Sequence, residues 1–328
     1  MPALTSIRCA GTALLTCRKA GCVRDVVTMD EIPALHRRIA SLPLAARRHA
    51  LRASWLVKTG FGRHGGFGLD TTLCKTLRLG NRESRRLDRE IAFHDTLTEL
   101  EWLSLLVRST DELIADARHV STEGEATLAR AAASGAPVIL APLHMGNYVF
   151  GLAATMRTYF PGRRMLILRA RDDHEADTRV MERIREIGTE MRFLQVSDKA
   201  SYAEAVRFVR QGAVVIYFID LPPSYGGPVD VNLLGQPMQL ALGIDSLARV
   251  ANATVVPLSV TSSLIGDTVH VGRAFEVVDV GRAERMRIAG LVSRHVEGAI
   301  LRAPGQWHLW PRLDEFVPVS IAAPEAAE

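Results

Sequence analysis

The feature that most constrains the fold is the alternation of strand-like and helix-like segments that begins after Gly124. Short apolar runs, which predict buried strands, alternate there with longer segments whose apolar residues recur at helical spacing. This order is typical of βαβ units on a parallel sheet. We therefore predict an α/β fold with a mixed, largely parallel sheet flanked by helices. The expected strands are 137–142, 164–168, 191–196, 213–219, 254–261 and 268–275, and the expected helices are 148–159, 176–187, 200–210, 242–250 and 283–301.

The chain before this alternation has a helical pattern. Apolar residues recur at helix spacing between Asp30 and Lys58, with a break at Pro43, and again between Asn81 and Val107. The glycine-rich stretch 60–68 has no lysine after it and no strand before it, which predicts a loop rather than a phosphate site. The apolar stripe in 97–107 fits packing on the core or contact with a membrane interface, and packing is the commoner fate.

A length of 328 residues is compatible with one domain around a single sheet. We expect 29–120 to pack as an N-terminal helical region on an α/β core spanning 121–321, and 1–28 to form a leader or a disordered segment. The apolar stretch 10–17 is too short and too polar for a transmembrane helix. We predict a cytoplasmic protein without a transmembrane helix, with peripheral contact to the inner membrane left open.

Composition and charge narrow the class of protein. Hydrophobic residues make up 48% of the chain and charged residues 23%, as in ordinary globular proteins. The net charge is +4, but the arginines are spread along the chain, so we expect no nucleic-acid partner. This mild basic excess suits an acidic partner, such as an acyl-carrier protein, or an anionic membrane surface. The four cysteines lack the pairing of a zinc site or a disulfide framework, so no metal is expected.

The sharpest local feature is the segment 143–148, in which His144 follows an apolar strand and precedes a helix. Ligands of open α/β sheets bind at this place, because the strand end meets the unpaired amides of a helix N-terminus. Gly146 would let a substrate approach the backbone, and Asn147 would cap the helix or donate a hydrogen bond. The alternative is a structural histidine satisfied by the backbone.

Several segments together resemble the late acyltransferases of lipid A biosynthesis, the lauroyl and myristoyl transferases. The resemblance extends from about Asn81 to Arg312 and includes an expected glycerolipid acyltransferase-like fold. His144-Met145-Gly146-Asn147-Tyr148 is similar to the family's His-x-Gly-Asn-aromatic motif. The other matching segments are 81–94, 117–140, Leu168-Arg169 with Asp172, 211–220, 234–237 with Gly243, and Pro304-Gly305-Gln306-Trp307.

In that family the histidine acts as the general base, and a carboxylate five positions later orients its ring. Val149 occupies that position here. Three consequences stay open. In the first, Asp220 or Asp172 supplies the carboxylate. In the second, the acceptor is an amine, which needs less help from an oriented base, so that His144 alone suffices. In the third, the protein binds acyl chains or a carrier protein without catalysis.

The resemblance also suggests substrate-binding residues. Arg169 ends a strand, where a guanidinium would hold the phosphate of a lipid acceptor or of a phosphopantetheine arm, and a salt bridge to Asp172 is its alternative. Asp220 precedes two prolines that fix an extended loop. That loop, which includes Tyr225, is expected to line the acceptor site, and Gly235 follows it as a further substrate-binding candidate.

The resemblance predicts an acyltransferase that moves a fatty acyl group from an acyl-carrier-protein or coenzyme A thioester to a hydroxyl or amine. His144 is the expected base, and the acceptor is a lipid or a small molecule of specialised metabolism. No cofactor or metal is expected beyond the thioester donor. The alternative is a catalytically degenerate accessory protein that binds acyl chains or a carrier protein.

Overall fold

The computed structural model describes residues 33–62, 65–169, 190–195 and 199–318, together with Arg183 and Arg185. Its centre is a seven-stranded sheet in the order β1-β9-β8-β2-β5-β3-β4. All neighbouring strands are parallel except β8 and β9, which confirms the predicted mixed, largely parallel sheet. The strands are β1 Val120–Glu123, β2 Val138–Pro142, β3 Met165–Arg169, β4 Met191–Gln195, β5 Val214–Ile216, β8 Thr254–Ser262 and β9 Asp267–Val271.

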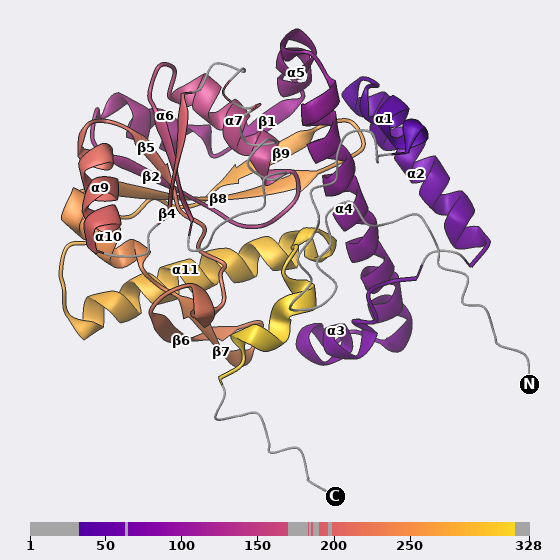
Figure 1. The fold of residues 1–328 in the computed structure, drawn as a ribbon. Helices are drawn as coiled ribbons and strands as arrows, with labels where there is room; N and C mark the ends of the chain where they lie inside the picture. The colour runs from indigo at the N-terminus through magenta and orange to yellow at the C-terminus, as the bar shows by residue number, and fades with distance from the viewer. Residues whose placement is uncertain are drawn as a thin grey trace, which may run out of the picture.

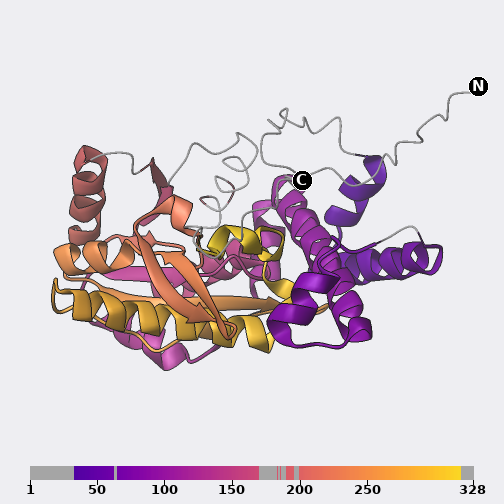
Figure 2. The same ribbon diagram turned by 90° about the horizontal axis from the view of Figure 1, so that it is seen from below.

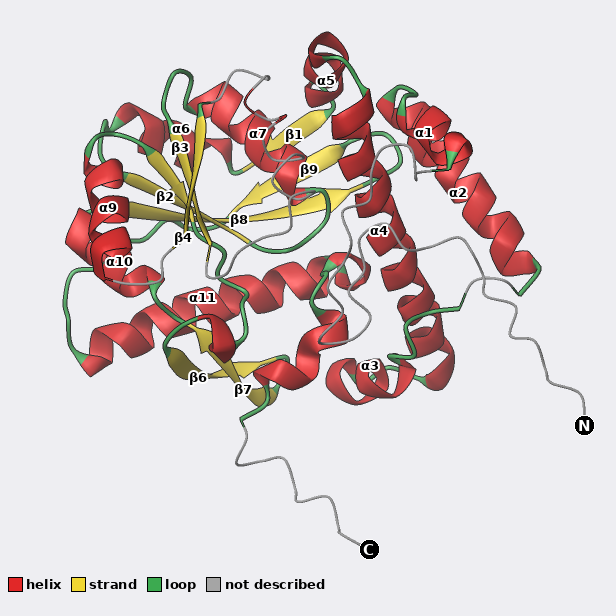
Figure 3. Cartoon of the chain, viewed as in Figure 1, coloured by secondary structure: helices red, strands yellow, loops and turns green. Residues whose placement is uncertain are grey.

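The central strand β2 is buried along its whole length. Its side chains alternate between two apolar clusters: Ile139 belongs to one, and Val138 and Leu140 belong to the other. A strand that is apolar on both faces requires helices on both faces. Figures 1 and 3 show α6 and α7 on one side of the sheet and α11 on the other. The helices of this core are α6 Glu125–Ala133, α7 Tyr148–Tyr159, α9 Lys199–Arg210, α10 Ile244–Ala251 and α11 Arg282–Arg302.

The N-terminal part of the described chain is helical, as predicted, and lies beside the sheet (Figure 2). Its helices are α1 Ala34–Ala40, α2 Leu44–Gly60, α3 Asp70–Leu77, α4 Asn81–Val107 and α5 Thr110–Ala117. Pro43 separates the first two because it caps α2. On α4, Leu97, Leu100, Leu103 and Leu105 are at most 6% exposed. Packing, and not membrane contact, therefore accounts for the apolar stripe of this helix.

Several segments differ from their predicted form. The segment 228–241 forms an antiparallel hairpin of β6 Pro228–Leu233 and β7 Gln236–Ala241, which the sequence analysis did not predict. Leu234 and Gly235 join these strands with positive φ angles of 56° and 72°. The strand predicted to reach residue 275 ends at Val271. Most of the predicted helix 176–187 lies outside the described residues.

Two short 3-10 helices, η3 Pro304–Gln306 and η4 Trp310–Phe316, follow α11, and a third, η2 Pro223–Tyr225, follows β5. The expected strand 213–219 is shorter, because regular pairing stops at Ile216. Its continuation still follows β2, since the amides of Tyr217 and Ile219 donate to the carbonyls of Leu140 and Pro142. No helix in the described part of the chain is long and apolar enough to span a membrane.

Candidate active site

The loop between β2 and α7 carries His144 at the carboxyl end of the sheet. β2 ends at Pro142 and α7 begins at Tyr148, so five residues connect a central strand to a helix. The N-terminus of α7 places its unpaired amides and partial positive charge next to this loop. The sequence analysis predicted this junction correctly.

His144 is paired with Asp220, which lies 76 residues further along the chain. The Nδ1 atom of His144 is 2.8 Å from Oδ1 of Asp220, and the backbone amide of His144 donates to Oδ2 of the same carboxylate, also at 2.8 Å. Asp220 is fully buried, whereas the His144 side chain is 22% exposed. The pair arises because the chain after β5 continues alongside β2, which brings the two strand ends together.

The His144 ring is held in one orientation. It stacks on Phe218, with ring centroids 4.0 Å apart and planes 23° apart, and the edge of Tyr148 contacts it at a centroid distance of 5.5 Å. With Nδ1–H donating to Asp220, the remaining ring nitrogen, Nε2, is an acceptor in the neutral imidazole. Such a histidine can accept a proton from a bound hydroxyl or amine.

Residues 306–308, near the C-terminus, form hydrogen bonds with the loop and with Asp220. The indole Nε1 of Trp307 donates to Oδ2 of Asp220 at 3.0 Å. The carbonyl of Gln306 accepts from the amide of Gly146, and the amide of His308 donates to the carbonyl of His144. No role was predicted for these three residues from the sequence, although Gln306 and Trp307 belong to the Pro-Gly-Gln-Trp segment that carried part of the family resemblance.

Gly146 is required by the chain's own packing. Its φ is +57°, and a Cβ atom there would lie 2.5 Å from the carbonyl oxygen of Val260 on β8. Its carbonyl accepts from Nε2 of His308 at 2.9 Å. Burial lowers the pKa of His308 to about 4, so this ring is neutral near neutral pH. Strand β8 therefore approaches Gly146 too closely for any residue with a Cβ atom.

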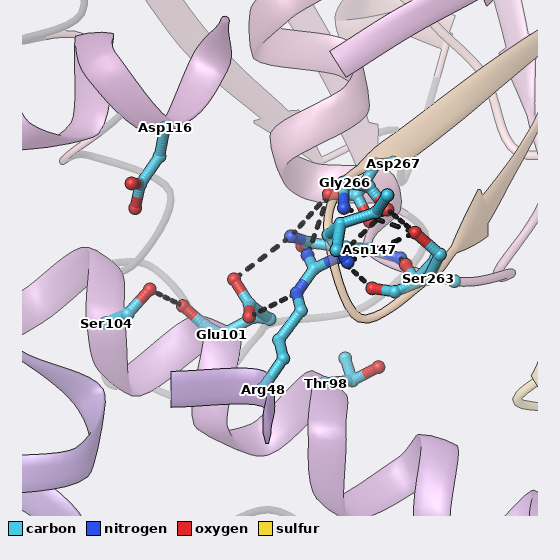
Figure 4. Close-up of polar contacts among 12 residues, drawn as sticks. Arg48, Thr98, Glu101, Ser104, Asp116, Asn147, Ser263, Gly266 and Asp267 are labelled. Carbon is cyan, nitrogen blue, oxygen red and sulfur yellow. Dashed lines mark hydrogen bonds and ion pairs between the residues drawn. The ribbon is translucent and has the colours of Figure 1, made fainter. Parts of the chain in front are cut away.

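Asn147 faces a buried cluster of charged groups (Figure 4). Its side chain makes no helix cap and is 3% exposed; its Nδ2 lies 3.5 Å from Glu101 and 3.3 Å from Asp267. Its backbone amide donates to the Ser262 hydroxyl at 3.0 Å. Of the two roles expected for Asn147, its side chain shows hydrogen-bond donation and not helix capping. Its amide group instead joins the loop to the charged cluster.

This buried cluster ties α2 and α4 to the loop. Arg48 donates to Glu101 at 2.9 Å, to Asp267 at 2.9 Å and to the Ser263 carbonyl at 2.7 Å. Arg47 donates to both Glu101 and Asp116 at 2.6 Å. With Arg108, which contacts Asp116, the cluster holds three guanidinium groups and three carboxylates, each at most 4% exposed. The charges balance, as buried ions require.

The pKa of Glu101 follows from this arrangement. Burial opposes its ionisation, but the guanidinium groups of Arg48 and Arg47 outweigh burial and lower the pKa. Asp267 has a raised pKa, because burial and the neighbouring Glu101 outweigh the attraction of Arg48. The cluster therefore contains one carboxylate strongly held in its charged form and one that is easier to protonate.

The Val149 side chain lies in the apolar core. It lies on α7, is fully buried, and belongs to the same apolar cluster as Val138 and Leu140. An acid at this position would enter the core of the protein. Asp220 supplies the carboxylate beside His144, which was the first of the three consequences left open by the sequence.

The remaining predicted site residues fall into different surroundings. Arg169 ends β3, and Asp172 lies outside the described residues. Tyr225 is half-buried, with the Arg312 guanidinium 5.3 Å from its ring centroid. Gly235 lies in the β6–β7 turn, where its positive φ gives a backbone reason for glycine. The described residues contain no group of three or more His, Cys, Asp or Glu side chains suited to hold a metal ion.

Comparison with known proteins is consistent with this geometry. Residues 100–313 match the family model described as bacterial lipid A biosynthesis acyltransferase. The match contains His144, Asp220 and Trp307, but it begins after α2 and therefore leaves out Arg47 and Arg48. A search of curated proteins finds no match to this chain.

Proposed function

The chain belongs to the bacterial lipid A biosynthesis acyltransferase family, and we propose that it transfers a fatty acyl group from a thioester to a hydroxyl or amine. The family supports acyltransferase activity in general. The donor we propose is acyl-carrier protein or coenzyme A carrying the acyl chain. The acceptor is a lipid or a small molecule of specialised metabolism. We propose no cofactor or metal for this reaction.

The observation that carries the proposal is the pair formed by His144 and Asp220. In the proposed reaction, Nε2 of His144 removes the proton of the acceptor hydroxyl or amine while the acceptor atom attacks the thioester carbonyl. The tetrahedral intermediate then collapses, the carbon–sulfur bond breaks, and the leaving thiolate takes the proton from His144. Asp220 stabilises the imidazolium that forms between these steps and keeps Nδ1 protonated.

The burial of Asp220 supports its role as the orienting acid. Three donors converge on its carboxylate: the ring and the amide of His144, and the indole of Trp307. Charge-assisted hydrogen bonds of this kind are stronger than neutral ones, so they hold the His144 ring in its orientation during the reaction. An intact base–acid pair favours catalysis over the alternative of a binding protein that has lost its activity.

We further propose that the enzyme works in the cytoplasm, in peripheral contact with the inner membrane. Acyl-carrier protein and acyl-coenzyme A are both acidic, and the net charge of +4 favours their approach. In this proposal Arg169 holds a phosphate of the donor or the acceptor, and the loop containing Tyr225 borders the acceptor.

The test is intact-protein mass spectrometry of acyl-carrier protein loaded with a mixed set of acyl groups. The purified protein is added with a cell extract that supplies acceptors. We expect His144→Ala to abolish the loss of acyl groups while its circular dichroism and thermal unfolding stay those of the parent protein. His119→Ala, which removes an exposed histidine, is the matched control and should leave transfer unchanged.

Two results would contradict the proposal. The first is transfer that persists in a folded His144→Ala protein, which would exclude this residue as the base. The second is binding of the acylated carrier without any loss of acyl groups across a broad set of acceptors, which would favour the accessory-protein alternative. The chain length consumed in a positive experiment identifies the donor.

A further inference from the structure

A cavity of about 500 Å³ lies between α2 and α4, apart from the His144 ring. One face of each helix lines it. The lining residues recur at helical spacing from Arg52 to Thr59 on α2 and from Arg86 to Leu97 on α4. Two helix faces that point at one another normally close by side-chain packing. Here they leave space of the size that small-molecule sites have.

Three guanidinium groups line this cavity. Arg52 lies over the Phe93 ring, with 4.6 Å between its Cζ atom and the ring centroid, and Arg86 and Arg89 are exposed. Among the residues that the structure describes, none of the three is paired with a carboxylate; Glu90 is the one acid in the lining. This differs from the arginines of the buried cluster nearby, whose charges are balanced. The cavity therefore has an uncompensated positive charge.

The wall also contains apolar side chains. Trp55 and Phe93 contact each other edge to face, with centroids 5.6 Å apart, and together with Leu97 they are at most 6% exposed. Leu56, which is 57% exposed, also lines the cavity. An alkyl chain that lies against Leu56 would bury the exposed apolar surface of this side chain, which stabilises binding. Charge and apolar surface thus occur within one cavity.

The cavity also reaches residues that hold the catalytic loop. Ser262 and Gln306 line it. The Ser262 hydroxyl accepts from the amide of Asn147, and the Gln306 carbonyl accepts from the amide of Gly146. A molecule in the cavity would therefore contact residues that hydrogen-bond directly to the backbone of the loop carrying His144.

We propose that this cavity binds a single-chain lipid anion, an alkyl chain that ends in a phosphate or a carboxylate. The three arginines hold the head group, and the exposed Leu56 contacts the chain. Arginine is suited to both kinds of head, because its planar donors match the oxygens of either group. An acidic protein helix is an unsuitable occupant, since its diameter of about 10 Å exceeds what such a cavity encloses.

The experiment is isothermal titration calorimetry on the purified full chain, with dodecyl phosphate and dodecanoate used below their critical micelle concentrations. Inorganic phosphate supplies a head without a chain, and dodecyl maltoside supplies a chain without charge. We expect at least one of the two anionic amphiphiles to bind at least tenfold more tightly than either of these probes. The stronger of the two identifies the head group.

Arg86→Gln/Arg89→Gln should weaken binding of the favoured amphiphile at least tenfold. Arg82→Gln/Arg85→Gln makes the same charge change on exposed residues of the same helix outside the cavity lining, and it should leave binding unchanged. Equal weakening in both variants would mean nonspecific attraction and would overturn the proposal. Equally tight binding of inorganic phosphate, or of dodecyl maltoside, would overturn it as well. None of these measurements requires acyl transfer, so this proposal and the proposed function can fail independently.

Discussion

At the scale of single residues, the candidate active site contains one carboxylate, that of Asp220, whose two oxygens both accept hydrogen bonds. In Asp220→Asn, one oxygen becomes an amide NH2 group, which donates and cannot accept. The one remaining oxygen then faces three donors, the ring and the amide of His144 and the indole of Trp307. We expect kcat to fall by about 10²- to 10⁴-fold with a smaller change in KM, as removal of an orienting acid does elsewhere. Steady-state kinetics measure both constants.

Asp230→Asn is the control for this change, because Asp230 is exposed on β6, where it accepts from Gln239. It should leave kcat unchanged. If Asp220→Asn retained full activity, Asp220 would have no part in orienting the base, and His144 would act without an acid.

Val149→Glu tests the other residue-scale conclusion. Because Val149 is fully buried in an apolar cluster, a glutamate there would place a carboxyl group in the core without a partner. We expect the free energy of unfolding to fall by about 3 kcal/mol or more, with no gain in activity. Urea denaturation measures this, and Val280→Glu, at a position that is 72% exposed, should change it little. A stable and more active Val149→Glu would mean that this side chain reaches His144.

At the scale of elements, α2 supports the candidate active site although it precedes the family match. Its Arg48 balances the carboxylates of α4 and β9 that also contact Asn147. Removing one partner of a buried ion pair leaves an uncompensated charge, which costs about 3–5 kcal/mol. We expect Arg48→Met to lower the free energy of unfolding by that amount.

Chemical denaturation followed by circular dichroism checks the Arg48 prediction, with Arg38→Met on the exposed face of α1 as control. In protein that remains folded, we also expect a lower kcat, because the Asn147 end of the loop loses its anchor. Full stability and activity in Arg48→Met would show that the carboxylates of the cluster do not need this cation.

At the scale of the whole molecule, stability should depend on pH through buried histidines. Burial lowers the pKa of His94 to about 3 and that of His308 to about 4, below the value of 6.5 expected in the unfolded chain. Between these values the unfolded state binds more protons than the folded state, so stability falls as the pH falls from about 6.5 towards 4. We expect a loss on the order of 2 kcal/mol per histidine by pH 5.

Denaturation curves at pH 7.5 and pH 5 measure this dependence. His94→Gln should show a smaller loss than the parent protein, because a glutamine takes up no proton. His119→Gln, which changes an exposed histidine, should show the same loss as the parent. A stability that does not change between these pH values would contradict the neutral, buried state of both rings.

The sequence alone determined the class of fold and the position of His144 between a strand and a helix. Hydrophobic periodicity is local, so it identified the buried strand before His144 and the helix 148–159 with its observed bounds. Hydrophobic periodicity did not reveal the β6–β7 hairpin, because the proline and glycine residues of this segment indicate a loop. The pairing of its two strands depends on the turn at Leu234 and Gly235.

The tertiary structure decided which carboxylate is paired with His144 and which contacts hold the loop. From the sequence, Asp220 was a candidate because it ends a strand expected to neighbour the one before His144, and Asp172 was a candidate because it follows Arg169. Only the register of β5 beside β2 brings the Asp220 carboxylate to His144. Trp307 and Arg48 reach the same loop from opposite ends of the chain. Contacts over such separations leave no periodic trace in a sequence, because they depend on how elements pack and not on the spacing within any one of them.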